Sequence, residues 1–267
     1  MPTLPPQIIA LGGGGFSVER GGTLLDDYVL SQLSGPRPRV CFLPTASGDA
    51  DHYIVRFYRR FAADCEASHV SLFRRDQGAG AVEEDLERHL LAQHLIYVGG
   101  GNMLSMIGAW RAHGLDRTLR RAWRAGIVLC GPSAGSLCWF QQALSAFHGS
   151  PKVVAGLGLL PYSNCVHYDA EPARRVEYQR AIAHGMCGGY AADDGVALHF
   201  RGRALHRVVS ARHGAGAYRV TLEEGRVHEN RLEAGELPEQ VTPERLRRRA
   251  ARRASSLISP RPAAVSA

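Results

Sequence analysis

The sequence contains no long hydrophobic run, which argues against a membrane-spanning protein. No stretch among its 267 residues approaches the about 18–20 consecutive apolar residues that a transmembrane helix needs. Residues 1–6 carry no basic residue ahead of an apolar segment, so we expect no secretion signal. The hydrophobic content of 45% is nevertheless sufficient for a substantial globular core. We therefore expect a soluble chain with no membrane partner.

Cysteines are few and have no regular spacing. No C-x-x-C pair occurs, so neither a disulfide framework nor a cysteine-based metal site is indicated. Most of the cysteines lie in apolar stretches and are expected to be reduced and buried. The six are Cys41, Cys65, Cys130, Cys138, Cys165 and Cys187. This usage favours the cytoplasm.

The positive charge is concentrated at one end of the chain. The formal net charge is +7, and residues 244–267 contain seven arginines and one acid, so this segment carries +6 and the remainder about +1. A basic segment rich in Ala, Ser and Pro is typical of a solvated, disordered tail, although a binding arm remains the alternative. We therefore expect one folded domain over residues 1–243, a tail over residues 244–267, and no nucleic-acid partner.

Short apolar runs alternate with amphipathic stretches in the first two thirds of the chain. Residues 51–63 and 115–125 have apolar side chains at helical spacing. The apolar runs are four to six residues long and end at turn residues, which is typical of strands buried on both faces. They comprise residues 7–11, 39–43, 69–73, 95–98 and 127–130. The pattern predicts an α/β fold, a three-layer sandwich around a mostly parallel sheet.

The pattern changes after residue 191. Four short strands are predicted, separated by turns that contain glycine: residues 196–200, 204–211, 218–222 and 226–232. We interpret them as antiparallel strands that complete the sheet or pack beside it within the same domain.

Residues 131–135 fit the pattern G-x-S-x-G between a predicted strand and a predicted helix over residues 136–142. A tight strand-to-helix turn of this kind projects a serine hydroxyl, here that of Ser133, above the sheet edge. The amide of Ala134 is then placed to donate to an oxyanion. The alternative is a glycine-rich turn that serves packing only.

A second glycine-rich turn, residues 99–101 followed by Asn102, also ends a strand and precedes a helix. A single crossover joins it to the Ser133 turn, so both turns are expected to face one cleft. Its amides are candidates for a second oxyanion donor, and Asn102 is a candidate for capping the helix, bracing the loop or binding substrate. A phosphate-binding loop is the alternative, but no G-x-G-x-x-G or P-loop pattern is completed. Residues 12–15 are interpreted as a structural turn.

A nucleophilic serine requires a base, and twelve histidines are available. His167 stands out because it follows an apolar stretch at the predicted end of a strand. His148 lies in a polar loop, and the later strands carry His199, His206 and His213, where surface positions are common. Position alone leaves this choice open.

Taken in order, residues 97–102, 131–135 with 138–140, 156–161 and 167–169 resemble the peptidase E group of serine peptidases, family S51. This group includes aspartyl dipeptidases and cyanophycinases. The similarity covers residues 8–220 and implies a fold like that of class I glutamine amidotransferases, related to flavodoxin. It implies Ser133 as nucleophile, His167 as base, and an oxyanion hole formed by Ala134 and a glycine of the triple-glycine turn, with Gly100 preferred to Gly101. No metal or organic cofactor is implied.

The third member of the triad departs from that family pattern. In those enzymes an acid follows the serine after a short interval, which here corresponds to residues 148–151 and contains no acid. Asp169 is two residues beyond His167, similar to the His-x-Glu of glutamine amidotransferases. We therefore predict Asp169 as the acid and Glu171 as the second choice, and a weak or inactive enzyme if neither reaches His167.

The resemblance implies a small peptide as substrate. Aspartyl dipeptidases need a cation for the substrate carboxylate, and Arg174 and Arg175 are candidates, with a solvated helix face as the alternative. A homodimer is retained as a hypothesis. Two rival functions also remain: an esterase or lipase of the α/β-hydrolase type, which orders its triad differently, and a non-catalytic binding protein of the same fold.

Overall fold

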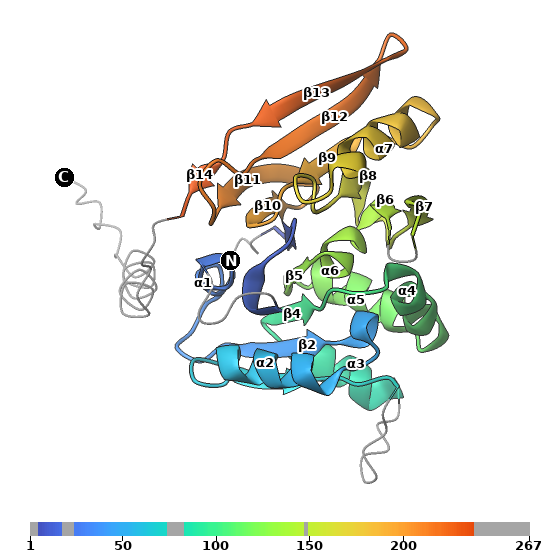
Figure 1. The fold of residues 1–267 in the computed structure, drawn as a ribbon. Helices are drawn as coiled ribbons and strands as arrows, with labels where there is room; N and C mark the ends of the chain where they lie inside the picture. The colour runs from blue at the N-terminus through green and yellow to red at the C-terminus, as the bar shows by residue number, and fades with distance from the viewer. Residues whose placement is uncertain (1–4, 18–23, 74–82, 147–148, 238–267) are drawn as a thin grey trace, which may run out of the picture.

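The computed structural model describes residues 5–17, 24–73, 83–146 and 149–237 (Figure 1). The predicted basic tail, residues 244–267, lies outside this part of the chain. Within the described ranges, every helix is too short or too polar to cross a bilayer.

An eight-stranded sheet forms the centre of the fold. Five of its strands are mutually parallel, in the spatial order β1, β5, β4, β2, β3. They are β1 (Gln7–Leu11), β2 (Arg39–Leu43), β3 (Glu66–His69), β4 (Leu95–Val98) and β5 (Val128–Pro132). Beyond β1 the sheet continues with β10 (Val196–Arg201), which is antiparallel to β1, and with β11 (Ala204–Ser210), which is antiparallel to β10. The short β14 (Gly235–Glu236) then pairs in parallel with β11. The carboxyl ends of β1, β4 and β5 therefore meet at one edge.

Alternate residues of the parallel strands face opposite sides of the sheet, and helices cover both sides. On one side lie the 3-10 turn η1 (Gly15–Ser17), α1 (Leu24–Leu30) and α2 (Asp51–Phe61), which bury aromatic side chains against β2 and β4. On the other side lie α3 (Glu83–Leu91), α4 (Met103–Ala112) and α5 (Leu115–Arg124). A second 3-10 turn, η2 (Thr45–Ser47), follows β2. The result is a three-layer α/β/α arrangement.

A second, six-stranded sheet packs beside the first and shares part of its core. Its strands are β6 (Phe140–Ser145), β7 (Lys152–Ala155), β8 (Leu160–Cys165), β9 (Gly189–Ala192), β12 (Ala217–Glu223) and β13 (Arg226–Leu232). The last two form a hairpin that extends from one end of the molecule, with α7 (Pro172–Ala183) alongside it (Figure 1).

The predicted α/β class with a large, mostly parallel sheet is confirmed. The later strands divide between the two sheets: β10 and β11 complete the first, whereas β12 and β13 belong to the second. Two local predictions were wrong. The helix predicted over residues 136–142 ends after one turn, since α6 covers Ala134–Leu137 and the chain from Phe140 onward forms strand β6, which pairs with β7 and β8. The strand predicted over residues 69–73 is replaced by β3, which ends at His69.

Candidate active site

Ser133 lies in a strained turn between β5 and α6. Its backbone adopts φ 54° and ψ −120°, in a region that residues with a side chain rarely occupy. Glycines are needed on both sides, because a Cβ atom on Gly131 or Gly135 would lie 2.2 Å or 2.1 Å from the carbonyl oxygen of Val98. The turn therefore packs against the end of β4 and presents the Ser133 side chain at the carboxyl edge of the sheet.

The triple-glycine turn after β4 lies directly beside Ser133. A Cβ atom on Gly100 would be 3.3 Å from Cβ of Ser133 and 3.8 Å from its Oγ. As predicted, β4 and β5 are parallel neighbours, so the two turns adjoin. The Gly100 amide donates a hydrogen bond of 3.1 Å to the Tyr53 hydroxyl.

His167 follows β8 and is held against the end of β1. Its backbone also has a positive φ, 54°, and its amide donates to the carbonyl oxygen of Gly12 at 3.2 Å. The Ser133 amide donates to the preceding carbonyl, that of Leu11, at 3.4 Å. The two residues are thus anchored to adjoining peptides of one strand end. In the described part of the chain Ser133 Oγ forms no hydrogen bond with His167, and such catalytic hydrogen bonds are often formed only when substrate binds.

The imidazole of His167 is hydrogen bonded to a carboxylate that the sequence patterns did not indicate. Its Nδ1 atom lies 2.5 Å from Oδ1 of Asp194, in the turn between β9 and β10. A neutral imidazole that donates through Nδ1 carries its lone pair on Nε2, as a general base requires. The side chains of His167 and Asp194 are 29% and 41% exposed, so the pair is accessible from solvent.

The two acids predicted from the sequence do not contact the imidazole. Asp169 accepts a hydrogen bond from the backbone amide of Asp194 at 3.0 Å and pairs with the guanidinium of Arg212. Partial burial acts to raise the pKa of Asp169, but the hydrogen bonds from Arg212 and the Asp194 amide outweigh it and hold that pKa below its usual value. Glu171 pairs with Arg174 at 2.7 Å. Among the described residues, Asp194 is the acid next to His167.

The residues predicted to bind substrate have structural partners. The Asn102 side chain caps α4, one of the roles predicted for it, by accepting a hydrogen bond from the Ser105 amide at 3.1 Å. Arg175 pairs with Glu229 of β13, and its guanidinium lies 4.9 Å from the ring centre of Tyr218. Arg174 is only 6% exposed, and its Nε atom is buried without a hydrogen-bond partner in the described residues.

The other candidate histidines are engaged elsewhere. His199 is fully buried between Tyr28 and Gln7, His206 is exposed on β11, and His213 pairs with Glu236. His148 lies outside the described residues. No group of three or more His, Cys, Asp or Glu side chains within the described ranges is arranged to hold a metal ion.

Comparison with known proteins relates this geometry to one family. The model of peptidase family S51 matches residues 8–208, which include Ser133, His167 and Asp194. The chain belongs to peptidase family S51. Membership of this family, predicted from the ordered motifs, is therefore confirmed and supports a peptidase.

Relatives of this S51 chain agree in sequence and in fold. An uncharacterized peptidase of Bacillus subtilis (strain 168), YgaJ, is 46% identical over 225 residues, which cover 84% of this chain and 95% of the relative. A crystal structure of a peptidase from an acI-B1 Actinobacterium superposes with a TM-score of 0.63 at 16% identity, covering 88% of this chain and 96% of that one. A candidate peptidase E protein from Listeria monocytogenes EGD-e gives 0.54 at 16% identity, covering 86% and 100%. At such identities the two structures show the shared fold.

Two contributors to the site were missed in the sequence. Asp194 follows Asp193 and precedes Gly195, just before the strand predicted over residues 196–200, and this acidic turn was the available signal. Tyr53 gave no signal, because its spacing on α2 is that of an ordinary core residue.

Proposed function

We propose that this S51 chain is a serine peptidase that cleaves small peptides. Ser133 is the nucleophile, His167 the general base and acid, and Asp194 the group that orients His167. Ala134 and the triple-glycine turn supply the oxyanion donors. The observation that carries the proposal is the hydrogen bond of 2.5 Å between His167 and Asp194 beside a strained serine elbow.

The reaction is acyl transfer in two steps. His167 Nε2 takes the proton of Ser133 Oγ as that oxygen attacks the peptide carbonyl carbon, and main-chain amides stabilise the oxyanion. The imidazolium then protonates the departing amine as the carbon–nitrogen bond breaks. A water molecule, deprotonated by His167, cleaves the resulting ester and regenerates Ser133. Asp194 accepts from Nδ1 throughout and stabilises the imidazolium.

For the substrate, we favour Arg174 over Arg175 as the contact for a carboxylate. Arg175 already has Glu229 as its ion-pair partner and aromatic rings from Tyr168 and Tyr218 against its guanidinium. Arg174 also has an ion-pair partner, Glu171, which its Nη2 contacts, but it lies seven residues after His167 and its Nε has no hydrogen-bond partner among the described residues. A guanidinium can bind a carboxylate through two parallel hydrogen bonds, which is consistent with a short acidic or free-ended peptide.

The cysteines support a reducing, cytoplasmic environment. None of the six is in a disulfide, and five are buried. Burial raises the pKa of Cys41 to about 12, so this thiol remains protonated.

An activity panel with a matched variant tests the proposal. The purified full-length chain is offered free dipeptides, including Asp-X peptides, blocked peptides and p-nitrophenyl esters, and is treated separately with a fluorophosphonate probe. We expect peptide hydrolysis and labelling of Ser133, both abolished in folded Ser133→Ala. Ester cleavage without peptide cleavage would identify an esterase. A folded wild-type chain that neither cleaves nor reacts would indicate a binding protein and overturn the proposal.

A further inference from the structure

We infer that Tyr53 is a positioning residue of this site: its hydroxyl fixes the Gly99–Gly100 peptide beside Ser133, so that the amide of Gly101, together with that of Ala134, receives the oxyanion. The inference rests on the proposed function in that it takes Ser133 as the nucleophile. It replaces Gly100, the donor preferred from the family resemblance, with its neighbour.

The hydrogen bonds of the triple-glycine turn leave one amide available. The Gly99 amide donates to Leu43 at 3.0 Å, and the Asn102 amide donates to Ala46 at 2.8 Å. The Gly100 amide donates to the Tyr53 hydroxyl at 3.1 Å. Of these four consecutive amides, that of half-buried Gly101 has no acceptor in the described part of the chain. An amide without an acceptor, in a residue that is not fully buried, is what an oxyanion site requires in the free enzyme.

The elbow offers the complementary donor. Ala134 is the first residue of α6, and no acceptor for its amide is found within the described ranges. The amide of Ser133 itself is occupied by Leu11. The remaining donors at the elbow therefore follow Ser133, as they do in other serine hydrolases with this turn.

The orientation of the Gly99–Gly100 peptide agrees with a role for Tyr53. In a trans peptide the carbonyl and the amide hydrogen point in opposite directions. The Gly99 carbonyl faces the nucleophile turn, since a Cβ atom on Gly135 would lie 3.1 Å from its oxygen. The Gly100 amide accordingly points away from that turn, toward Tyr53. Because glycines allow rotation of such a peptide at little cost, an external hydrogen bond is needed to fix it.

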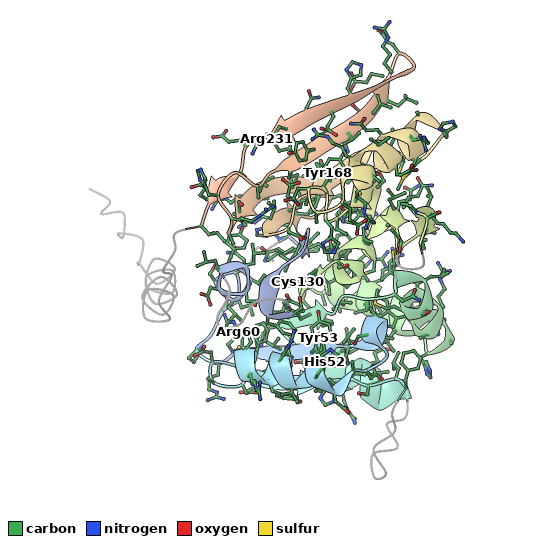
Figure 2. All side chains as sticks on the ribbon, viewed as in Figure 1. His52, Tyr53, Arg60, Cys130, Tyr168 and Arg231 are labelled. Carbon is green, nitrogen blue, oxygen red and sulfur yellow. The ribbon has the colours of Figure 1, made fainter. Side chains whose placement is uncertain are left out.

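The Tyr53 ring is itself rigidly held. The residue is 7% exposed and lies on the sheet-facing side of α2 (Figure 2). Its ring centre is 5.0 Å from that of Phe42 and 5.3 Å from that of Phe16. Burial raises the pKa of Tyr53, so the phenol stays neutral and can accept from Gly100 at any pH at which the protein works. The hydroxyl is thus a fixed acceptor.

Tyr53→Phe removes this acceptor and keeps the ring. With the Gly100 amide released, the turn samples other arrangements and the Gly101 amide is no longer held for the oxyanion. We expect kcat to fall about ten- to hundredfold, less than the ~10²–10³ for removal of a whole oxyanion donor, with KM changed by less than about twofold. Tyr58→Phe is the matched control: it lies on the same helix, but its hydroxyl contacts His69, and its kinetics should equal those of the wild type.

Amide NMR of the ¹⁵N-labelled chain gives a readout that does not depend on turnover. We expect the Gly100 amide to be protected from exchange in the wild type and in Tyr58→Phe, and to lose protection in Tyr53→Phe. In a phosphonate or boronate adduct of Ser133, the Ala134 and Gly101 amide protons should move downfield while that of Gly100 keeps its shift.

Each contrary outcome has a distinct meaning. A downfield shift of Gly100 in place of Gly101, or unchanged kcat and Gly100 protection in folded Tyr53→Phe, would overturn the role of Tyr53 and leave the peptidase proposal intact. A wild-type chain without turnover or adduct, but with Tyr53-dependent protection of Gly100, would instead refute the proposed function.

Discussion

His167 and Asp194, 27 residues apart in the chain, are joined by a hydrogen bond of 2.5 Å between Nδ1 and Oδ1. Both are held by backbone contacts to the end of β1: the His167 amide donates to Gly12, and the amide of Gly195 donates to Gly13. The strand that adjoins the nucleophile turn therefore also aligns the base with its acid.

We predict that Asp194→Asn lowers kcat/KM by roughly 10³–10⁴, because an amide in place of the carboxylate favours the wrong imidazole tautomer and does not stabilise the imidazolium. Asp169→Asn is the matched control and should cost about tenfold at most, since its oxygen can still accept from the Asp194 amide. Steady-state kinetics and fluorophosphonate labelling rates measure both. A larger loss in Asp169→Asn than in Asp194→Asn would restore Asp169, the acid predicted from the sequence, to the triad.

The sequence predicted the elements that local patterns specify. Apolar runs ending in glycine gave β1, β4 and β5, and G-x-S-x-G between strand and helix located the turn at Ser133. The acid beside His167 was harder to predict from the sequence, because an acid can be brought to an imidazole from any turn that the topology places nearby. Proximity along the chain favoured Asp169, but the left-handed backbone at His167 and the return of β9 beside β8 bring Asp194 to the ring instead.

Arg212 is predicted to act on the site through the Asp194 turn. Its Nε donates to the carbonyl oxygen of Asp194 at 3.0 Å, and its Nη2 pairs with Asp169, which in turn holds the Asp194 amide. Arg212→Ala should lower kcat about tenfold with little change in KM. Arg212→Lys should restore only part of the lost kcat, since an ammonium group cannot reproduce the two directed hydrogen bonds of a guanidinium. Arg226→Ala, on the distant hairpin strand β13, is the control and should have wild-type kinetics.

Gly13 leaves room for the contact between His167 and Asp194. A Cβ atom there would lie 1.9 Å from Oδ1 of Asp194 and 2.9 Å from Cε1 of His167. Its φ is not positive, so Gly13→Ala should fold and displace the flexible carboxylate, lowering kcat/KM by about 10²–10³ with a small change in Tm.

The control for that substitution is Gly108→Ala. Gly108 is exposed in α4, and its added Cβ would meet nothing within 4 Å. This variant should retain activity and gain roughly 0.5–1 kcal/mol in unfolding free energy from helix propensity. Wild-type activity in folded Gly13→Ala would contradict the importance of the His167–Asp194 contact.

Buried His199 is predicted to make stability depend on pH. Its Nδ1 lies 2.7 Å from the Tyr28 hydroxyl and its Nε2 2.9 Å from Gln7 Oε1, and burial, with lesser effects of His206, Arg201 and Arg207, lowers its pKa from 6.5 to about 3. Between these values the unfolded chain binds a proton that the folded chain does not. The unfolding free energy is therefore highest above pH 6.5. It decreases as the pH falls toward 3, by at most about 1.4 kcal/mol per pH unit.

Urea unfolding between pH 7.5 and 4 measures this dependence. In His199→Gln, which keeps a neutral polar side chain, the unfolding free energy should decline less steeply over that interval than in the wild type. His206→Gln, exposed on the neighbouring strand β11, should retain nearly the wild-type slope. Equal slopes in the wild type and His199→Gln would show that His199 is protonated in the folded protein, because only a group that stays neutral on folding adds to the slope.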